Sequence, residues 1–114
     1  MPKVAVLDES CKPVLDRLRK VAMALPGVVE TLTYGNPTFK ANGKAFAVLD
    51  RYKGEYCIWI RCDGKLRAKL LKDGAFFPSP YDKAKQAVCR KLDGLNWKEF
   101  APQVKASYDI ATML

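Results

Sequence analysis

Residues 38–51 read TFKANGKAFAVLDR, and this stretch decides the fold. Two β-rich segments flank Asn42-Gly43, a dipeptide that favours the two-residue turn of a β-hairpin. A second turn is indicated at Lys53-Gly54, and residues 55–62 are again rich in aromatic and β-branched side chains. The sequence therefore predicts an antiparallel meander in the middle of the chain.

The two turns also predict a register for this meander. A two-residue turn at 42–43 places Phe39 opposite Phe46, and one at 53–54 places Val48 opposite Trp59. One face of the sheet then carries aromatic and cationic residues, namely Phe39, Lys44, Phe46, Val48, Cys57, Trp59 and Arg61. The other face carries Ala45, Ala47, Leu49, Tyr56, Ile58 and Ile60. These small and aliphatic side chains favour a helix packed closely on the second face.

Periodicity places further elements on both sides of the meander. Helical spacing predicts helices over residues 11–25 and 65–72 and from Asn96 onward, and β-rich patterns predict strands over 29–34 and 86–92. Residues 35–37 are predicted as a turn, and residues 76–81 as a rigid apolar loop that contains two prolines. We expect one α+β domain over residues 1–114, with residues 1–10 as an irregular or extended lead-in. Its antiparallel sheet has about five strands, and helices from both ends of the chain pack on it.

The chain is basic, and the excess charge lies in its middle. There are 20 Lys and Arg against 12 Asp and Glu, so the formal net charge is 20 − 12 = +8. Residues 36–74 alone hold nine basic and four acidic groups, a net charge of +5. A concentrated positive field favours polyanions such as nucleic acid. Solubility alone is the alternative interpretation of this charge.

The sequence gives little support to metal-binding, cofactor-dependent, enzymatic or membrane functions. The chain has no His, and none of its four Cys forms a C-x-x-C pair, so we expect no metal and no cofactor. The cysteines are predicted to be small buried hydrophobes, and we expect no enzymatic activity because no His can pair with a thiol. The alternative is an enzymatic activity. It would use Cys62 beside Arg61 and Lys65, or Tyr34, Tyr81 or Lys44 as a base. No apolar run approaches the length that spans a bilayer, and we expect a cytoplasmic monomer without a membrane partner.

An ordered set of motifs resembles the MmcQ/YjbR family. The residues that carry the resemblance are Leu25-Pro26-Gly27-Val28, residues 34–40 (YGNPTFK), residues 42–47 (NGKAFA), Phe77-Pro78 with Tyr81, Lys91-Leu92-Asp93, Trp97 and Ser107-Tyr108. The chain departs from the family at Asn36, where relatives often have His, and at Ala87, where they often have Trp. Roles assigned to that His or Trp in relatives therefore do not transfer to this chain.

The resemblance implies an α+β domain whose fold is similar to the double-wing DNA-binding domain of a phage transcription factor. Members of the family are usually described as DNA-binding on that basis, and the family supplies no catalytic residues to carry over. Together with the central positive charge, the resemblance indicates a protein that binds DNA through its phosphate backbone.

Two candidate sites follow from these observations. The predicted nucleic-acid contacts are Lys40, Lys44, Arg61, Arg67 and Lys69 for phosphates and Trp59 for base stacking. The alternative for the aromatic residues is that Phe39, Phe46 and Trp59 form core beneath the last helix. A different function class is a small-ligand or protein-interaction module that uses the aromatic loop 76–81 as the wall of a pocket. The alternative for that loop is that Phe76 and Phe77 fill the core.

Overall fold

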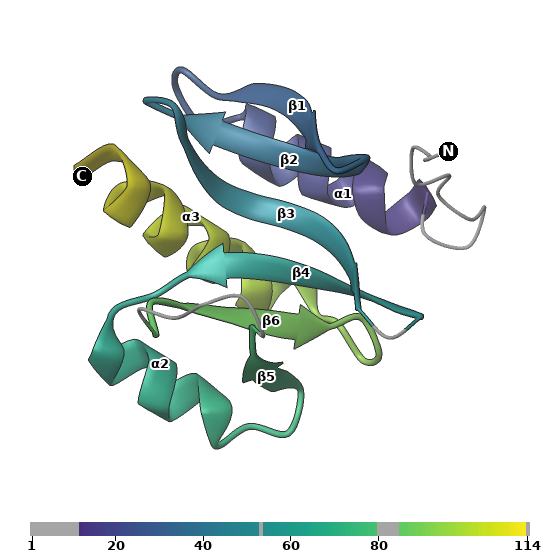
Figure 1. Cartoon of the computed structure of the whole chain (residues 1–114), viewed down its shortest axis with the longest axis vertical. Helices are drawn as coiled ribbons and strands as arrows, with labels where there is room; N and C mark the ends of the chain where they lie inside the picture. Colours follow the sequence, from purple (N-terminus) through teal and green to yellow (C-terminus); the bar gives the residue numbers. More distant parts are fainter. Residues whose placement is uncertain (1–11, 53, 80–84, 114) are drawn as a thin grey trace.

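The computed structural model describes residues 12–52, 54–79 and 85–113 (Figure 1). Its elements in chain order are α1 (Lys12–Met23), β1 (Val29–Thr33), β2 (Asn36–Ala41), β3 (Lys44–Tyr52), β4 (Glu55–Arg61), α2 (Gly64–Leu71), β5 (Phe76–Pro78), β6 (Ala87–Lys91) and α3 (Trp97–Met113). The predicted α+β class is confirmed. The predicted lead-in at residues 1–10 lies outside the described residues.

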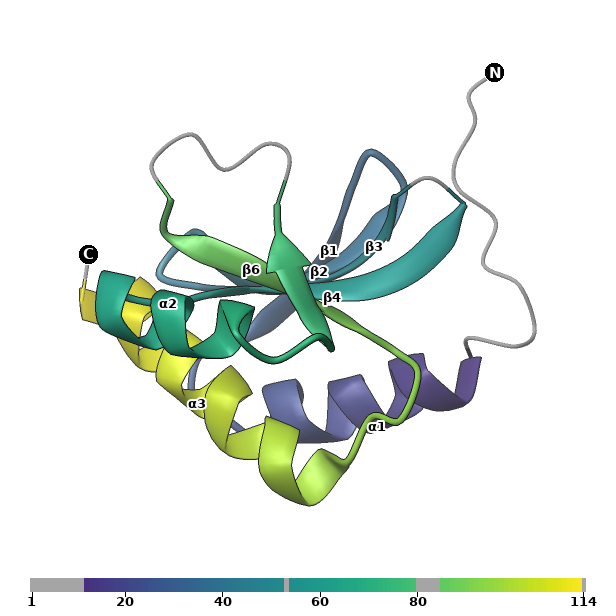
Figure 2. The same cartoon turned by 90° about the horizontal axis from the view of Figure 1, so that it is seen from below.

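All six strands join one antiparallel sheet in the order β1-β2-β3-β4-β6-β5. The expected count of about five was too low because Phe76–Pro78, predicted as loop, pairs with β6 as an edge strand. A proline is tolerated there because an edge strand need not donate on its outer side. The three helices lie together on one face of the sheet, and no described helix covers the other face (Figure 2).

The turns of the meander explain why its strands form. Asn42 and Gly43 both have positive φ, 53° and 74°, as a type I′ hairpin turn requires. Tyr34 and Gly35 repeat this geometry with φ values of 52° and 81°. The predicted turn at 35–37 was therefore placed too late, since the strand β2 already begins at Asn36. The predicted pairing of Val48 with Trp59 is confirmed.

The pairing of Phe39 with Phe46 is wrong, because a β-bulge lies between β2 and β3. Lys40 pairs with Ala45 but Phe39 pairs with Ala47, so Phe46 is an extra residue on β3. The bulge turns both phenylalanine rings toward the helices, where each is fully buried, and moves Ala45 to the opposite face. The core alternative is thus confirmed for Phe39 and Phe46. Trp59 lies on the face without helices.

The core lies between the sheet and the helices. Ala47, Leu49, Ile58 and Ile60 on the sheet are fully buried against residues such as Leu18 and Val104. At the bulge, the buried Ser107 of α3 donates its hydroxyl to the carbonyl of Phe46 at 2.6 Å and accepts the backbone N–H of Arg61 at 2.8 Å. One serine therefore pairs the two backbone groups that the bulge would otherwise leave without ladder partners. This contact fixes the end of the sheet where Arg61 lies.

Candidate nucleic-acid interface

The face without helices, which we call the open face, is organised in rows that cross the strands. The first row joins Lys40 to Ala45 on the neighbouring strand and Arg61 to Ala87. The Nε of Arg61 donates to the carbonyl of Ala45 at 2.6 Å, which links the two halves of the row. At its far end Arg67 reaches the row from α2, on the helix-covered side (Figure 2), and its Nε donates to the carbonyl of Ala87 at 3.3 Å. We call Lys40, Arg61 and Arg67 the cationic row.

Backbone bonds hold both guanidinium groups of this row in place. Arg61 and Arg67 are each half-buried and each donates to a strand carbonyl, so their positions follow from the sheet rather than from flexible stems. Lys40 and Arg61 lie two strands apart, with β3 between them, and Arg67 reaches β6, the next strand after β4, so the three cations follow one end of the sheet. The structure therefore brings together three of the five predicted phosphate contacts.

Lys44 and Lys69 lie near this row but are not part of it. Lys44 is exposed and begins β3, at the same end of the sheet as Lys40. It pairs with Ala41, whose side chain is buried in the core, so the bulge places Lys44 on the helix-covered face and not, as predicted, on the face of Trp59. Lys69 is exposed on α2, two residues from Arg67 and therefore on a different side of the helix. Within the described ranges, the ion pairs involve Arg19 and Lys105 and none involves Lys40, Lys44 or Lys69. The positive charge of these three lysines is thus not neutralised by a described carboxylate.

Trp59 occupies the second row of the open face, between Val48 and Cys89 on the adjoining strands. Its ring is half-buried, and the guanidinium carbon of Arg61 lies 5.5 Å from the ring centroid. Trp59 helps to line a groove of about 710 Å³ on this face. The other residues that line the groove are Thr33, Tyr34, Asn36, Thr38, Ala45, Val48, Asp50, Arg51 and Ser79.

A hydrogen-bonded polar pair forms the third row, on the side of Trp59 away from the cations. The Nδ2 of Asn36 donates to Oδ1 of Asp50 at 3.0 Å, and the same carboxylate oxygen accepts the backbone N–H of Arg51 at 2.7 Å. The sequence did not reveal this pair, because the two residues lie 14 positions apart and meet only in the shifted register that the bulge imposes. Tyr34, which the sequence suggests only as a possible base, is 96% exposed and lines the same groove.

The cysteines of the described segments are buried, as predicted: Cys57 and Cys89 on the open face and Cys62 in the core. A hydrogen bond with the Cys89 thiol, burial, and the nearby charges raise the pKa of Cys57 well above its ordinary value of 9.0. A raised pKa keeps the thiol protonated and weakly nucleophilic at neutral pH. The fourth cysteine, Cys11, lies outside the described residues.

The raised pKa of Cys57 predicts a loss of stability at high pH. Above about pH 9 the unfolded chain releases this proton while the folded chain retains it, so the free energy of unfolding falls by up to about 1.4 kcal/mol per pH unit. Below that pH the contribution is fully present. Urea titrations of wild type and Cys57→Ala between about pH 7 and pH 10 measure it: the wild type should fall more steeply. Parallel profiles would contradict the prediction.

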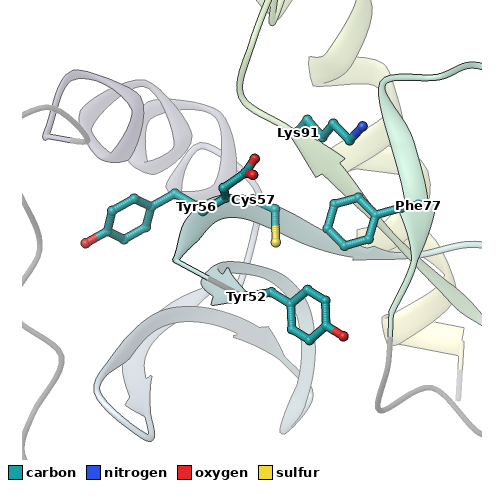
Figure 3. A pocket seen from close by; sticks show the side chains of 6 residues that line it. Tyr52, Tyr56, Cys57, Phe77 and Lys91 are labelled. Atoms are coloured by element: carbon teal, nitrogen blue, oxygen red, sulfur yellow. The ribbon is translucent and has the colours of Figure 1, made fainter.

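A second, smaller hollow lies on the open face near β5. It has a volume of about 170 Å³ and is lined by Tyr52, Glu55, Tyr56, Cys57, Phe77 and Lys91. Figure 3 shows the thiol of Cys57 between the rings of Tyr52 and Phe77, which stack with centroids 6.2 Å apart. This volume matches cavities that accept a single small ring.

One residue of the predicted loop at 76–81 lines this hollow, and another lies in the core. Phe76 is buried in the core, whereas Phe77 is half-buried and faces the hollow. The core alternative therefore holds for the first ring and not for the second. Pro80 and Tyr81 lie outside the described residues. A small-ligand module that uses this hollow stays a prediction.

The described residues contain no group of three or more His, Cys, Asp or Glu side chains placed to hold a metal ion. None of the helices in the described ranges is both long and apolar enough to cross a membrane.

Comparisons with known proteins place the chain in a family. The YjbR family model matches residues 23–110. Protein DR2400 of Deinococcus radiodurans, which has a DUF419 domain, has a similar crystal structure: TM-score 0.74, 22% identity, covering 86% of this chain and 78% of that one. A Pseudomonas syringae protein of known structure has a TM-score of 0.68 and 13% identity, covering 92% of this chain and 99% of its own.

At these identities the two structures establish a shared fold and no more. No curated protein sequence matches the chain. The family model covers most of the sequence, including the whole meander and every residue named in the open-face rows. The chain therefore belongs to the YjbR family.

Proposed function

We propose that this chain is a non-enzymatic DNA-binding protein that contacts the phosphate backbone through the cationic row. The observation that carries the proposal is the alignment of Lys40, Arg61 and Arg67 along one end of the sheet. Phosphates repeat along a strand, so several cations lined up along one end of a rigid sheet suit a nucleic-acid backbone better than a single small anion.

The surrounding charge supports the same partner. Lys44 is exposed at the same end of the sheet, and Lys65, Lys69 and Lys72 are exposed on α2, the helix that supplies Arg67. The row thus lies within the most basic part of a chain whose formal charge is +8. Contacts of this kind bind the backbone and read little sequence, so we expect weak sequence preference.

A salt titration tests the proposal. With about 4–6 phosphates contacted, log affinity for a fluorescently labelled duplex should fall against log salt concentration with a slope of about −4 to −5, and somewhat less steeply for a single strand. Anisotropy measured from low to physiological salt gives the slope. An affinity that does not change with salt would contradict a backbone-dominated interface, and no binding of either form at low salt would refute the function.

A further inference from the structure

We propose that the groove of the open face receives an unpaired base, stacked on Trp59, from a single strand whose phosphates lie on the cationic row. The inference rests on the proposed function and names the form of nucleic acid that the site prefers. It is carried by the juxtaposition of three rows on one face: cations, an aromatic ring, and a polar pair.

The first step is the spacing between the cations and the ring. Trp59 and Arg61 are two residues apart on β4 and so project from the same face, about 7 Å apart along the strand. The guanidinium of Arg61 also leans over the indole, 5.5 Å from its centroid. In a nucleotide a single sugar separates base and phosphate. A base placed on Trp59 therefore brings its own phosphate to the Arg61 end of the groove.

The second step is the position of the ring inside the groove. Trp59 is half-buried in a depression of about 710 Å³, within the range of sites that enclose a nucleotide-sized ligand. In a duplex the faces of the bases are covered by their neighbours, and only their edges are accessible from the grooves. A base can place its face on a recessed indole only if it is unpaired and unstacked. The recess therefore favours single strands.

The third step is the charge on the far side of the ring. Asp50 lies in the row beyond Trp59, opposite Cys57, and its carboxylate lines the groove. Arg51, which also lines the groove, offsets part of this negative charge, so the phosphates are assigned to the side of Lys40 and Arg61 because the cations are grouped there. The carboxylate and the Asn36 amide to which it is bonded instead face the edge of the base, where carboxylate oxygens accept from amino groups.

Tryptophan fluorescence offers a direct test, because the chain has only two tryptophans and the other, Trp97, lies on α3 beneath Arg17. In a Trp97→Phe background all indole emission comes from Trp59. Titration with a mixed-sequence 15-mer single strand should quench this emission and show tighter binding than its blunt duplex. Replacing Trp59→Ala in the wild-type chain should lower single-strand affinity by about 5- to 100-fold while changing duplex affinity by less than twofold.

The Trp59→Phe variant is the matched control, because it keeps an aromatic face and should retain most of the single-strand affinity. The inference is overturned if Trp59→Ala leaves single-strand affinity within twofold of wild type, or if the single strand does not quench Trp59. If either result is found while single strand and duplex still bind in a salt-sensitive manner, the inference about the groove fails but the proposed phosphate-backbone interface is retained. Absence of binding by the wild type would remove both proposals together.

Discussion

Replacing Lys40 and Lys44 together by glutamate is expected to abolish retention of DNA. The two substitutions change the charge by four units at the end of the sheet where the cationic row begins, which should lower affinity by roughly 100-fold or more at low salt. Neither lysine forms an ion pair in the described part of the chain, so their replacement removes no described ion pair. Anisotropy titrations against one labelled oligonucleotide measure the loss.

A matched double variant distinguishes binding through a local interface from binding that depends only on the net charge of the protein. Lys20 and Lys98 are exposed on α1 and α3, the helices on the opposite face of the sheet. Lys20→Glu with Lys98→Glu changes the net charge by the same four units and should lower affinity by no more than a few-fold. Equal losses in the two double variants would show that total charge, and not this row, controls binding. Far-UV circular dichroism of both variants confirms that the fold is intact.

Much of the meander could be predicted because its turns are encoded locally. Asn42-Gly43 supplies two residues that tolerate positive φ, and the pairing of Val48 with Trp59 follows from counting outward from the next turn. The aliphatic face was also predictable, since Ala47, Leu49, Ile58 and Ile60 alternate along their strands and all are buried under helices. Such signals depend only on a few neighbouring residues.

The bulge could not be predicted, because no local pattern requires it. Regular pairing would have placed Phe39 and Phe46 on the face that carries Trp59, away from the helices. The tertiary structure instead buries both rings, and Ser107, more than 40 residues away from either bonded partner, pairs the backbone groups left at the irregularity. Burying two phenylalanine side chains outweighs the loss of regular pairing at one position.

The candidate site, like the fold, could be predicted from the sequence only in part. Its residue types were evident from composition, since cations and a tryptophan in the central segment indicate nucleic acid. Their grouping was not evident: Arg67 joins Lys40 and Arg61 only through a carbonyl on β6, and Lys69 is on another side of α2. Asn36 and Asp50 form a pair only because of the shifted register.

Phe46→Ala is expected to cause a large loss of stability. The ring is fully buried and meets Tyr108 of α3 edge-on, with centroids 5.4 Å apart and planes at 84°. Tyr108 in turn donates its hydroxyl to the carbonyl of Pro26 at 2.6 Å, so the ring of Phe46 connects the bulge through α3 to the segment between α1 and β1. Truncation leaves a cavity at that junction and should lower the free energy of unfolding by about 3–5 kcal/mol.

Phe77→Ala is the matched control, because it removes the same ring from the open face, where Phe77 is half-buried against Tyr52. Its loss should be less than half as large, since only part of that ring is removed from water. Urea denaturation followed by circular dichroism measures both. Equal losses would mean that the open face contributes as much to the core as the helix-covered face. The large difference expected here follows from the bulge, which determines which phenylalanines fold inward and thereby leaves Trp59 on the face proposed to bind DNA.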